Sequence, residues 1–281
     1  SIVQIESKLQ KKVDITLRIN SFQSENLKVL TKTSRFGIPI SSVDSILRKI
    51  STAPELDLQG FAFHLDSTAI KERVMAIEAV IELLDAAQDY GLSPNLINIG
   101  GGYKVNYLEN KEEWDTYTSA LKESVLGERE PFTWNSHGFG LWTEQGKIKG
   151  SFKAYRFFDS QSSSAYLDEL LSQDSSLANQ TIGEVIRDRM IEVMIEPGRA
   201  LANQCGITVS RVVYTKKSST GENLIGVDMN RADLAFLEHE VFIDPILITQ
   251  EENSAPYSAY VLGNLCLESD LIFIRKITLI K

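Results

Sequence analysis

The sequence contains little cysteine and histidine and no excess of positive charge. Its 281 residues include two cysteines, Cys205 and Cys266, and three histidines. Neither the number nor the spacing of the cysteines suggests a disulfide framework or a zinc site, so we expect no metal. The net charge of −9 argues against nucleic acid as the main partner, because binding to a phosphate backbone requires clustered Lys and Arg.

Long apolar runs and a leader segment are also missing. No apolar run reaches the roughly 18–20 residues that span a bilayer, and no charged leader followed by an apolar block opens the chain. We therefore expect a cytoplasmic protein without membrane association. Hydrophobic residues make up 43% of the chain, which is ordinary for a globular protein with a substantial core. The chain opens and closes inside strand-like stretches, at residues 2–5 and 277–280, and we also expect it to be incomplete.

Short apolar strands and amphipathic helices alternate over most of the first 204 residues. Strands are expected at residues 2–5, 13–19, 58–65, 96–99 and 193–195. Helices are expected at about 43–50, 70–90 and 182–192; Asp66, Ser67 or Thr68 can cap the second, and Thr181 with Glu184 forms a capping box for the third. This alternation with short connections predicts a parallel sheet with helical crossovers.

Two stretches depart from this alternation. Residues 103–181 include an expected helix at about 114–126 and an aromatic, glycine-rich segment at 131–142, and we interpret them as an insertion in a first domain at 1–204. After Cys205, strand-like segments follow at 207–215, 224–229, 241–248, 257–262 and 271–280 without a convincing helix. This pattern predicts an all-β C-terminal domain at 205–281.

Three consecutive glycines, Gly100, Gly101 and Gly102, follow the expected strand at 96–99. Each glycine carries an entropy cost, so three together indicate that the backbone approaches something closely. Bare N–H groups at such a turn suit a phosphate, although the glycines alone are about equally compatible with a plain tight turn. Two other motifs, one upstream and one downstream, favour the phosphate site: Phe-His-Leu-Asp-Ser at 63–67 and Glu-Pro-Gly-Arg at 196–199.

Four motifs follow one another in a fixed order along the chain. They are Phe-His-x-x-Ser at 63–67, Ile-Gly-Gly-Gly-Tyr at 99–103, Glu-Pro-Gly-Arg at 196–199 and Gly-Asn-Leu-Cys-Leu-Glu-Ser-Asp at 263–270. The set resembles the fold-type III pyridoxal-phosphate decarboxylases, the family of ornithine, arginine and diaminopimelate decarboxylases. Ser-Arg-Phe-Gly-Ile at 34–38 resembles their Ser-Lys-Phe-Gly element. The implied fold is an α/β (β/α)₈ barrel followed by a β domain, with the five expected strands as barrel strands four to eight.

The resemblance implies pyridoxal phosphate as the cofactor and a role for each matching position. The implied cofactor-binding residues are His64, Ser67, Gly100, Gly101, Gly102, Glu196 and Arg199. The glycines, the serine and the arginine would bind the phosphate, since the arginine fork pairs well with phosphate oxygens. Glu196 would face the pyridine nitrogen and favour the protonated ring, which is the better electron sink, and His64 would stack on the ring. Without the motifs, a core histidine would be the better interpretation of His64, and Glu196 with Arg199 could equally be a structural ion pair.

Cys266 matches the cysteine that, in these decarboxylases, reaches across a dimer interface and serves protonation after carbon dioxide leaves. A thiol can act as an acid there because its reference pKa of about 8.5 lies near working pH. The resemblance therefore implies that Cys266 and His64 are catalytic, and that the protein is a homodimer with a shared active site. Outside this family, a free cysteine is usually a small buried hydrophobe.

The sequence also departs from the family pattern. The family's Schiff-base lysine lies in a Tyr-Ala-x-Lys-Ala-Asn setting that is not found here, so we expect amino-acid decarboxylation as part of a longer chain. Racemase-type chemistry on the same cofactor and a non-catalytic, decarboxylase-like regulator are the alternatives. Asp66 stands where glycine is usual, and Leu267 replaces an acidic residue that reads a distal substrate amine. Because an apolar side chain cannot pair a cation, ornithine, lysine or diaminopimelate is not expected to be the preferred substrate.

Overall fold

The computed structural model describes residues 12–22, 34–65, 67–155, 158–234, 240, 243–249 and 256–279. It divides the chain into two compact units. Unit 1 comprises Ser1–Lys104 and Gln161–Asn203, and unit 2 comprises Val105–Ser160 and Gln204–Lys281. This division separates the expected insertion at 103–181 into two parts, because residues 105–160 group with the C-terminal β segments while residues 161–181 belong to unit 1.

Unit 1 contains a five-stranded sheet with the order β2-β1-β3-β4-β7. The strands are β1 (Val13–Asn20), β2 (Ile38–Pro39), β3 (Leu56–Ala62), β4 (Leu96–Asn98) and β7 (Glu192–Met194). All neighbouring pairs are parallel, as the strand–helix alternation predicted. The expected strand at 2–5 lies outside the described residues. Strand β2 was not expected, because two residues are too few to show the alternation that marks a strand.

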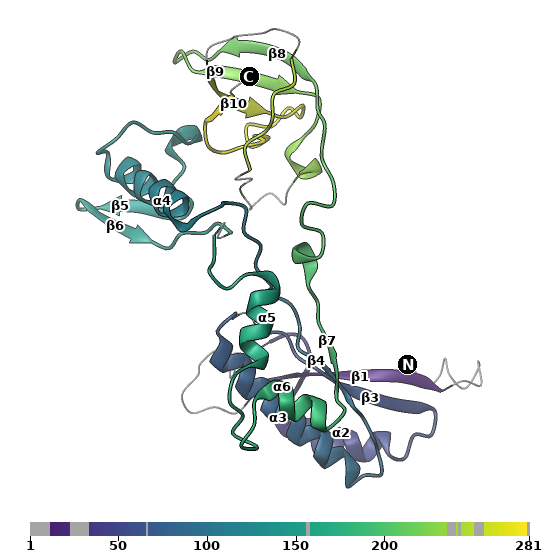
Figure 1. Ribbon diagram of the computed structural model, residues 1–281. Helices are drawn as coiled ribbons and strands as arrows, with labels where there is room; N and C mark the ends of the chain where they lie inside the picture. The colour runs from purple at the N-terminus through teal and green to yellow at the C-terminus, as the bar shows by residue number, and fades with distance from the viewer. Residues whose placement is uncertain are drawn as a thin grey trace. The chain divides into compact units, whose positions relative to one another are not determined.

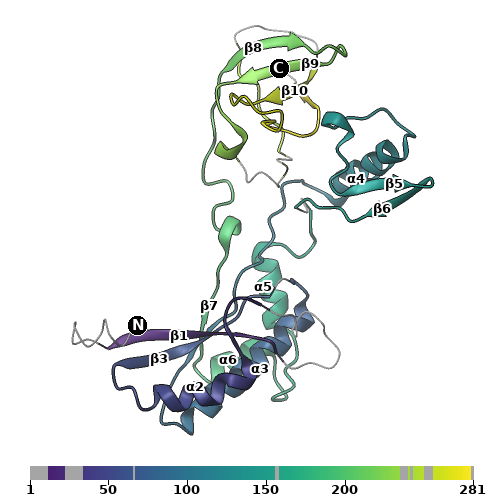
Figure 2. The ribbon, with the colours of Figure 1, turned by 180° about the vertical axis from the view of Figure 1, so that it is seen from behind.

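Four α-helices of unit 1 connect these strands. They are α2 (Val43–Ile50), α3 (Ile70–Gln88), α5 (Ser163–Leu171) and α6 (Ile182–Asp188). In both views α2, α3 and α6 lie on one side of β1 and β3 (Figures 1 and 2). The expected capping of α3 by Ser67 or Thr68 is wrong: the N-cap is Ala69, without a side-chain cap. The Ser67 hydroxyl instead accepts a hydrogen bond from the Ala69 N–H at 3.0 Å, and Asp66 lies outside the described residues.

The core of unit 1 forms between the sheet and these helices. The apolar stripe expected on α3 is buried, with Ile77 and Ile81 fully inaccessible, and it packs in one cluster with Phe61 from β3 and Ile97 from β4. Burying each such side chain stabilises the fold by about 1.5–3 kcal/mol. The ends of β3 and β4 are therefore fixed on a rigid platform.

Unit 2 contains a second sheet, with the order β11-β10-β9-β8. Its strands are β8 (Val212–Lys217), β9 (Asn223–Val227), β10 (Tyr257–Leu262) and β11 (Ile277–Leu279). The strand expected at 241–248 is wrong over the described residues 243–248, which form no strand. The apolar residues Ile246 and Ile248 are exposed there and join no sheet face.

The aromatic segment at 131–142 completes unit 2. It follows α4 (Lys111–Leu126) and leads into a hairpin of β5 (Leu141–Glu144) and β6 (Lys147–Gly150). Thr133 forms an antiparallel bridge with Arg275, and the Trp134 ring meets the Tyr260 ring edge-on at 5.0 Å. The segment is thus joined to the C-terminal sheet. Within the described ranges, no helix combines the length and apolarity needed to cross a membrane.

Candidate functional site

The ends of three parallel strands bring the predicted residues of unit 1 together. His64 follows β3, Gly100 follows β4 and Glu196 follows β7, each two residues beyond its strand. The strand register places Ala62 opposite Asn98 and Asn98 opposite Met194, so the three ends are level. In barrel enzymes, this carboxyl edge of the sheet carries the chemistry.

His64 lies between Glu196 and the glycine turn. Its Nδ1 atom is 3.5 Å from a Glu196 carboxylate oxygen and 3.4 Å from the Gly101 nitrogen. One ring nitrogen cannot serve both partners at once: unprotonated it accepts from the Gly101 N–H, and protonated it donates to the carboxylate. The His64 and Glu196 side chains are 39% and 53% exposed, so a ligand can reach both.

Asn98, which no sequence motif marked, links Glu196 to the glycine turn. Its buried side-chain amide donates to Glu196 Oε1 at 3.0 Å, and its Oδ1 accepts from the Gly100 N–H at 2.9 Å. The Glu196 N–H in turn donates to the Gly100 carbonyl at 3.0 Å. Three hydrogen bonds therefore hold the carboxylate of Glu196 beside the glycine turn.

The three glycines allow close approaches that other residues would block. Gly100 and Gly102 have φ values of +73° and +100°, which disfavour residues with a side chain. A Cβ at Gly101 would lie 2.7 Å from the Glu196 carbonyl, and one at Gly100 would lie 2.6 Å from the Phe63 carbonyl. The N–H of Gly102 makes no hydrogen bond within the described residues, whereas those of Gly100 and Gly101 are engaged.

Arg73 is a second residue of the site that was missed. It lies in the first turn of α3 with 0% exposure, and it donates to the carbonyls of Ile99 (2.9 Å), Gly101 and Ser67 (3.5 Å). No carboxylate among the described residues pairs with it, and its Nε has no hydrogen-bond partner there. A buried cation without a counter-ion is costly, so this charge beside the turn suits an anion such as phosphate.

The remaining predicted residues lie near these strand ends or in the other unit. Ser67 lies between β3 and α3 and is partly buried, and Arg199 is exposed on the short 3₁₀-helix η3 (Gly198–Ala200) just after Glu196. Cys266 belongs to unit 2, in the loop after β10, and is exposed, which excludes the alternative of a buried small hydrophobe. Buried Asp270 fixes this loop, because its carboxylate accepts from the Leu265 and Arg231 N–H groups at 2.8 Å each.

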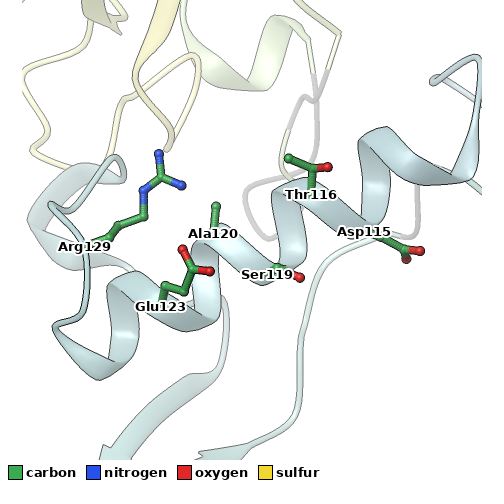
Figure 3. Close-up of a pocket in the computed structure, with 6 residues that line it drawn as sticks. All are labelled: Asp115, Thr116, Ser119, Ala120, Glu123 and Arg129. Atoms are coloured by element: carbon green, nitrogen blue, oxygen red, sulfur yellow. The ribbon is translucent and has the colours of Figure 1, made fainter.

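A hollow on the surface of unit 2 carries none of the predicted residues. It lies along α4 and the turn that follows, and Figure 3 shows its lining: Asp115, Thr116, Ser119, Ala120, Glu123 and Arg129. Asp115 is already paired with Lys111 at 3.2 Å. The strand ends of unit 1 therefore remain the candidate site.

Comparison with known proteins agrees with the geometry. A family model described as "Pyridoxal-dependent decarboxylase, pyridoxal binding domain" matches residues 2–149, more than half of the chain. The chain belongs to this family. Its cofactor is accordingly pyridoxal phosphate.

Two relatives that match most of this decarboxylase-family chain are about twice as long. Uncharacterized protein y4yA of Sinorhizobium fredii is 29% identical over 87% of the chain and 50% of its own length. Diaminopimelate decarboxylase of Haemophilus influenzae is 22% identical over 96% of the chain and 52% of its own. The chain thus spans about half the length of the curated relatives it matches.

Solved structures show the fold of the decarboxylase-family chain. Diaminopimelate decarboxylase from M. jannaschii, in co-complex with L-lysine, superposes with a TM-score of 0.63 at 16% identity, covering 99% of this chain and 53% of that one. The arginine decarboxylase of Paramecium bursaria Chlorella virus has a TM-score of 0.58 at 15% identity, covering 99% and 59%. The predicted fold class, part of a (β/α)₈ barrel followed by a β domain, is confirmed.

The strand ends fit the family's cofactor. The glycine turn, where neither the Gly102 N–H nor the buried charge of Arg73 has a counterpart among the described residues, suits the phosphate. The flat ring of His64 and the carboxylate of Glu196, 3.5 Å apart, offer a stacking surface and a partner for a pyridine nitrogen. The residues present are therefore compatible with pyridoxal phosphate.

Proposed function

We propose that the protein is a pyridoxal-phosphate-dependent amino-acid decarboxylase, and that this chain forms part of a longer one that supplies the Schiff-base lysine. One observation carries the proposal. In a chain of the pyridoxal-dependent decarboxylase family, His64, Asn98, the glycine turn and Glu196 meet at the carboxyl edge of one parallel sheet.

Each residue of unit 1 has a defined task in this proposal. Pyridoxal phosphate, when bound, supplies the sink for the electrons that a departing carboxylate leaves behind. Glu196 holds a proton on the pyridine nitrogen, and the Asn98 amide keeps its carboxylate oriented. His64 would offer its flat ring for stacking on the cofactor. The N–H of Gly102 and the side chains of Ser67 and Arg199 would donate hydrogen bonds to the phosphate, and Gly100 and Gly101 would let the backbone approach it closely.

Cys266 completes the reaction in this proposal. Its exposed thiol returns a proton to the α-carbon after carbon dioxide leaves, from the partner subunit of a homodimer with a shared active site. Buried Asp270 holds the loop that presents it. We propose that the enzyme is cytoplasmic. Its proposed substrate is a free amino acid.

Leu267 limits the choice of substrate. It directly follows Cys266 and is 62% exposed, so it offers an apolar surface at the place where a distal amine would need a carboxylate. A cation left beside it without a partner would be penalised by several kcal/mol once it is desolvated. We propose that ornithine, lysine and diaminopimelate are not the preferred substrates.

The test uses the full-length protein with a panel of amino acids, measuring carbon dioxide release and borohydride labelling of a lysine. We expect labelling together with gas release, and no preference for a diamino acid. Labelling without gas release would favour the racemase alternative, and no labelling would favour the regulator. A clear preference for a diamino acid would contradict the assignment of Leu267.

Two cysteine variants test the proton donor. Cys266→Ala should lower kcat by about a hundredfold, the scale of general acid catalysis. Cys205→Ala removes the other exposed thiol and should leave kcat unchanged, which makes it the matched control. Equal rates for the two variants would remove Cys266 from the mechanism.

A further inference from the structure

Arg73 is the most deeply buried charged side chain among the described residues of unit 1. It has 0% exposure, and its hydrogen bonds go to backbone carbonyls of Ile99, Gly101 and Ser67. Its guanidinium also lies over the Tyr166 ring at 5.5 Å. None of these partners carries a negative charge, and its Nε has no partner among the described residues. Among the described residues, the positive charge is therefore solvated by dipoles and not neutralised.

The carbonyls that Arg73 binds determine where the opposite N–H groups point. A trans peptide is planar, and its C=O and N–H point in opposite directions. When the Gly101 carbonyl turns inward to Arg73, the N–H of Gly102 must turn outward, and Gly102 is exposed. This N–H has no hydrogen-bond partner within the described part of the chain. In the same way, Arg73 holds the Ile99 carbonyl, and the Gly100 N–H points in the opposite direction, where it donates to Asn98 Oδ1 at 2.9 Å.

Very little space separates Arg73 from the turn. A Cβ built on Gly102 would lie 2.8 Å from Arg73 Nη2, and the φ of Gly102 is +100°. Within the described part of the chain, Arg73 thus occupies the inward side of Gly102, and we expect a ligand to approach this peptide from the outward side. An anion there would accept a hydrogen bond directly from the Gly102 N–H, and the buried guanidinium of Arg73 would attract it from the other side of a single peptide.

We infer that Arg73 is a positioning residue for a phosphate monoester at the glycine turn. It holds the Gly101 carbonyl inward, so that the Gly102 N–H faces the phosphate, and its buried charge is neutralised when the dianion binds. The inference rests on the proposed cofactor site and adds a residue to it that does not touch the ligand.

The experiment compares a phosphorylated probe with its unphosphorylated parent. Pyridoxamine 5′-phosphate and pyridoxamine are suitable, because neither has an aldehyde that could react with surface lysines. Their dissociation constants are measured by equilibrium dialysis for the full chain, for Arg73→Met and for Arg73→Lys. Arg189→Met is the matched control: it removes one positive charge from the same unit, at an exposed ion pair with Asp85.

For Arg73→Met we expect the affinity for pyridoxamine 5′-phosphate to fall about tenfold or more, because the Gly102 N–H is no longer held toward the phosphate and the nearby buried positive charge is lost. The affinity for pyridoxamine should stay within about twofold, because that probe has no anion for the turn. Arg73→Lys keeps the charge but cannot hold two carbonyls in one plane. The ratio of the affinities for the phosphorylated and unphosphorylated probes should therefore fall severalfold, less than in Arg73→Met. Arg189→Met should change neither constant. The ³¹P resonance of the bound probe should also titrate at higher pH in Arg73→Met, because the dianion loses its nearest buried cation.

The possible failures are distinguishable. An unmodified chain without preference for the phosphorylated probe would overturn the phosphate site and the role of Arg73 together. A preference that survives Arg73→Met would overturn the role of Arg73 alone, and so would an equal loss for both probes. If Arg73→Met does not fold, the two probe affinities of Arg73→Lys are compared instead. An unchanged preference for the phosphorylated probe would then overturn the role of Arg73. No decarboxylation is measured, so the outcome is independent of the proposed reaction.

Discussion

At the scale of single residues, Asn98 shows why an amide and not an acid joins the glycine turn to Glu196. An amide offers both a donor and an acceptor, whereas an ionised carboxylate only accepts. Asn98 uses both functions, donating to Glu196 Oε1 and accepting from the Gly100 N–H. Each partner is satisfied without placing a second negative charge in the site.

We therefore expect Asn98→Asp to destabilise unit 1 in a pH-dependent way. The new carboxylate would still accept from the Gly100 N–H but would lie about 3 Å from Glu196, where two carboxylates cannot both be ionised without cost. The loss in unfolding free energy should be about 1–3 kcal/mol near neutral pH and should shrink in acid, where the pair shares a proton. Urea denaturation followed by far-UV circular dichroism at two pH values measures it.

Asn95→Asp is the control for this prediction. Asn95 precedes β4 and is exposed, and its hydrogen bonds to described residues, Gln59 and Glu192, use its backbone alone. Its substitution should change the stability by no more than about 0.5 kcal/mol at either pH. A similar pH dependence in both variants would show that the effect belongs to overall charge and not to the pair with Glu196.

Sequence motifs marked several of the residues that the structure brings to the candidate site. His64, Gly100 and Glu196 were chosen from motifs at strand ends, and the structure brings them together. Arg73 was missed because a charged residue on a helix usually faces solvent. Its position in the sequence could have indicated burial. Arg73 lies four residues before Ile77, on the same buried stripe of α3, where a charged residue is unusual unless it has a polar partner or a function.

At the scale of secondary-structure elements, α6 depends on its first turn. The helix has only seven residues, and short helices gain little from propagation. The predicted capping box is confirmed: the Glu184 N–H donates to Thr181 Oγ1 at 3.2 Å, and the Glu184 carboxylate accepts from the Thr181 N–H at 2.9 Å. These backbone and side-chain hydrogen bonds from Thr181 lower the pKa of Glu184.

Thr181→Ala should lower the unfolding free energy by about 1 kcal/mol, the usual value of an N-cap. Ser162→Ala is the matched control, because Ser162 is the N-cap of α5 but its side chain makes no capping hydrogen bond. The effect of Thr181→Ala should also weaken as the pH falls through the lowered pKa of Glu184, since the protonated acid no longer supports the box. Thermal unfolding by circular dichroism measures both variants, and equal losses would contradict the prediction.

Elements were predictable wherever their periodicity extended over several turns or residues. Helices α2, α3 and α4 and strands β1, β3 and β10 were expected within a few residues of their observed bounds. Strand β2 is too short to carry a pattern, and residues 243–248 carry an apolar pattern that does not pair. Local sequence shows that a segment can be a strand, but pairing depends on what lies beside it.

At the scale of the whole molecule, the division into two units was the hardest feature to foresee. Residues 105–160 belong with the C-terminal sheet because Thr133 pairs with Arg275 and Trp134 packs on Tyr260. Contacts between segments so distant in the chain leave no local pattern in the sequence. All three tryptophans lie in residues 105–160, so tryptophan fluorescence reports the unfolding of unit 2.

A buried carboxyl group makes the stability of unit 2 depend on pH. Glu240 is 4% exposed, and burial raises its pKa to about 7, against hydrogen bonding from the Ile274 N–H and the nearby charges of Arg231 and Arg275. In the unfolded chain this carboxyl has its ordinary value of 4.5. Between these two values the folded state holds a proton that the unfolded state has already lost.

The sign follows from linkage: where the folded state binds more protons, stability falls as the pH rises. We expect unit 2 to lose about 3 kcal/mol between about pH 5 and about pH 8 through this one group. Glu240→Gln should remove that dependence, because a neutral amide has no proton to release, whereas Glu123→Gln, at an exposed glutamate of α4, should keep it. Urea denaturation followed by tryptophan fluorescence across this pH range measures the difference, and parallel curves for the two variants would show that Glu240 does not control it.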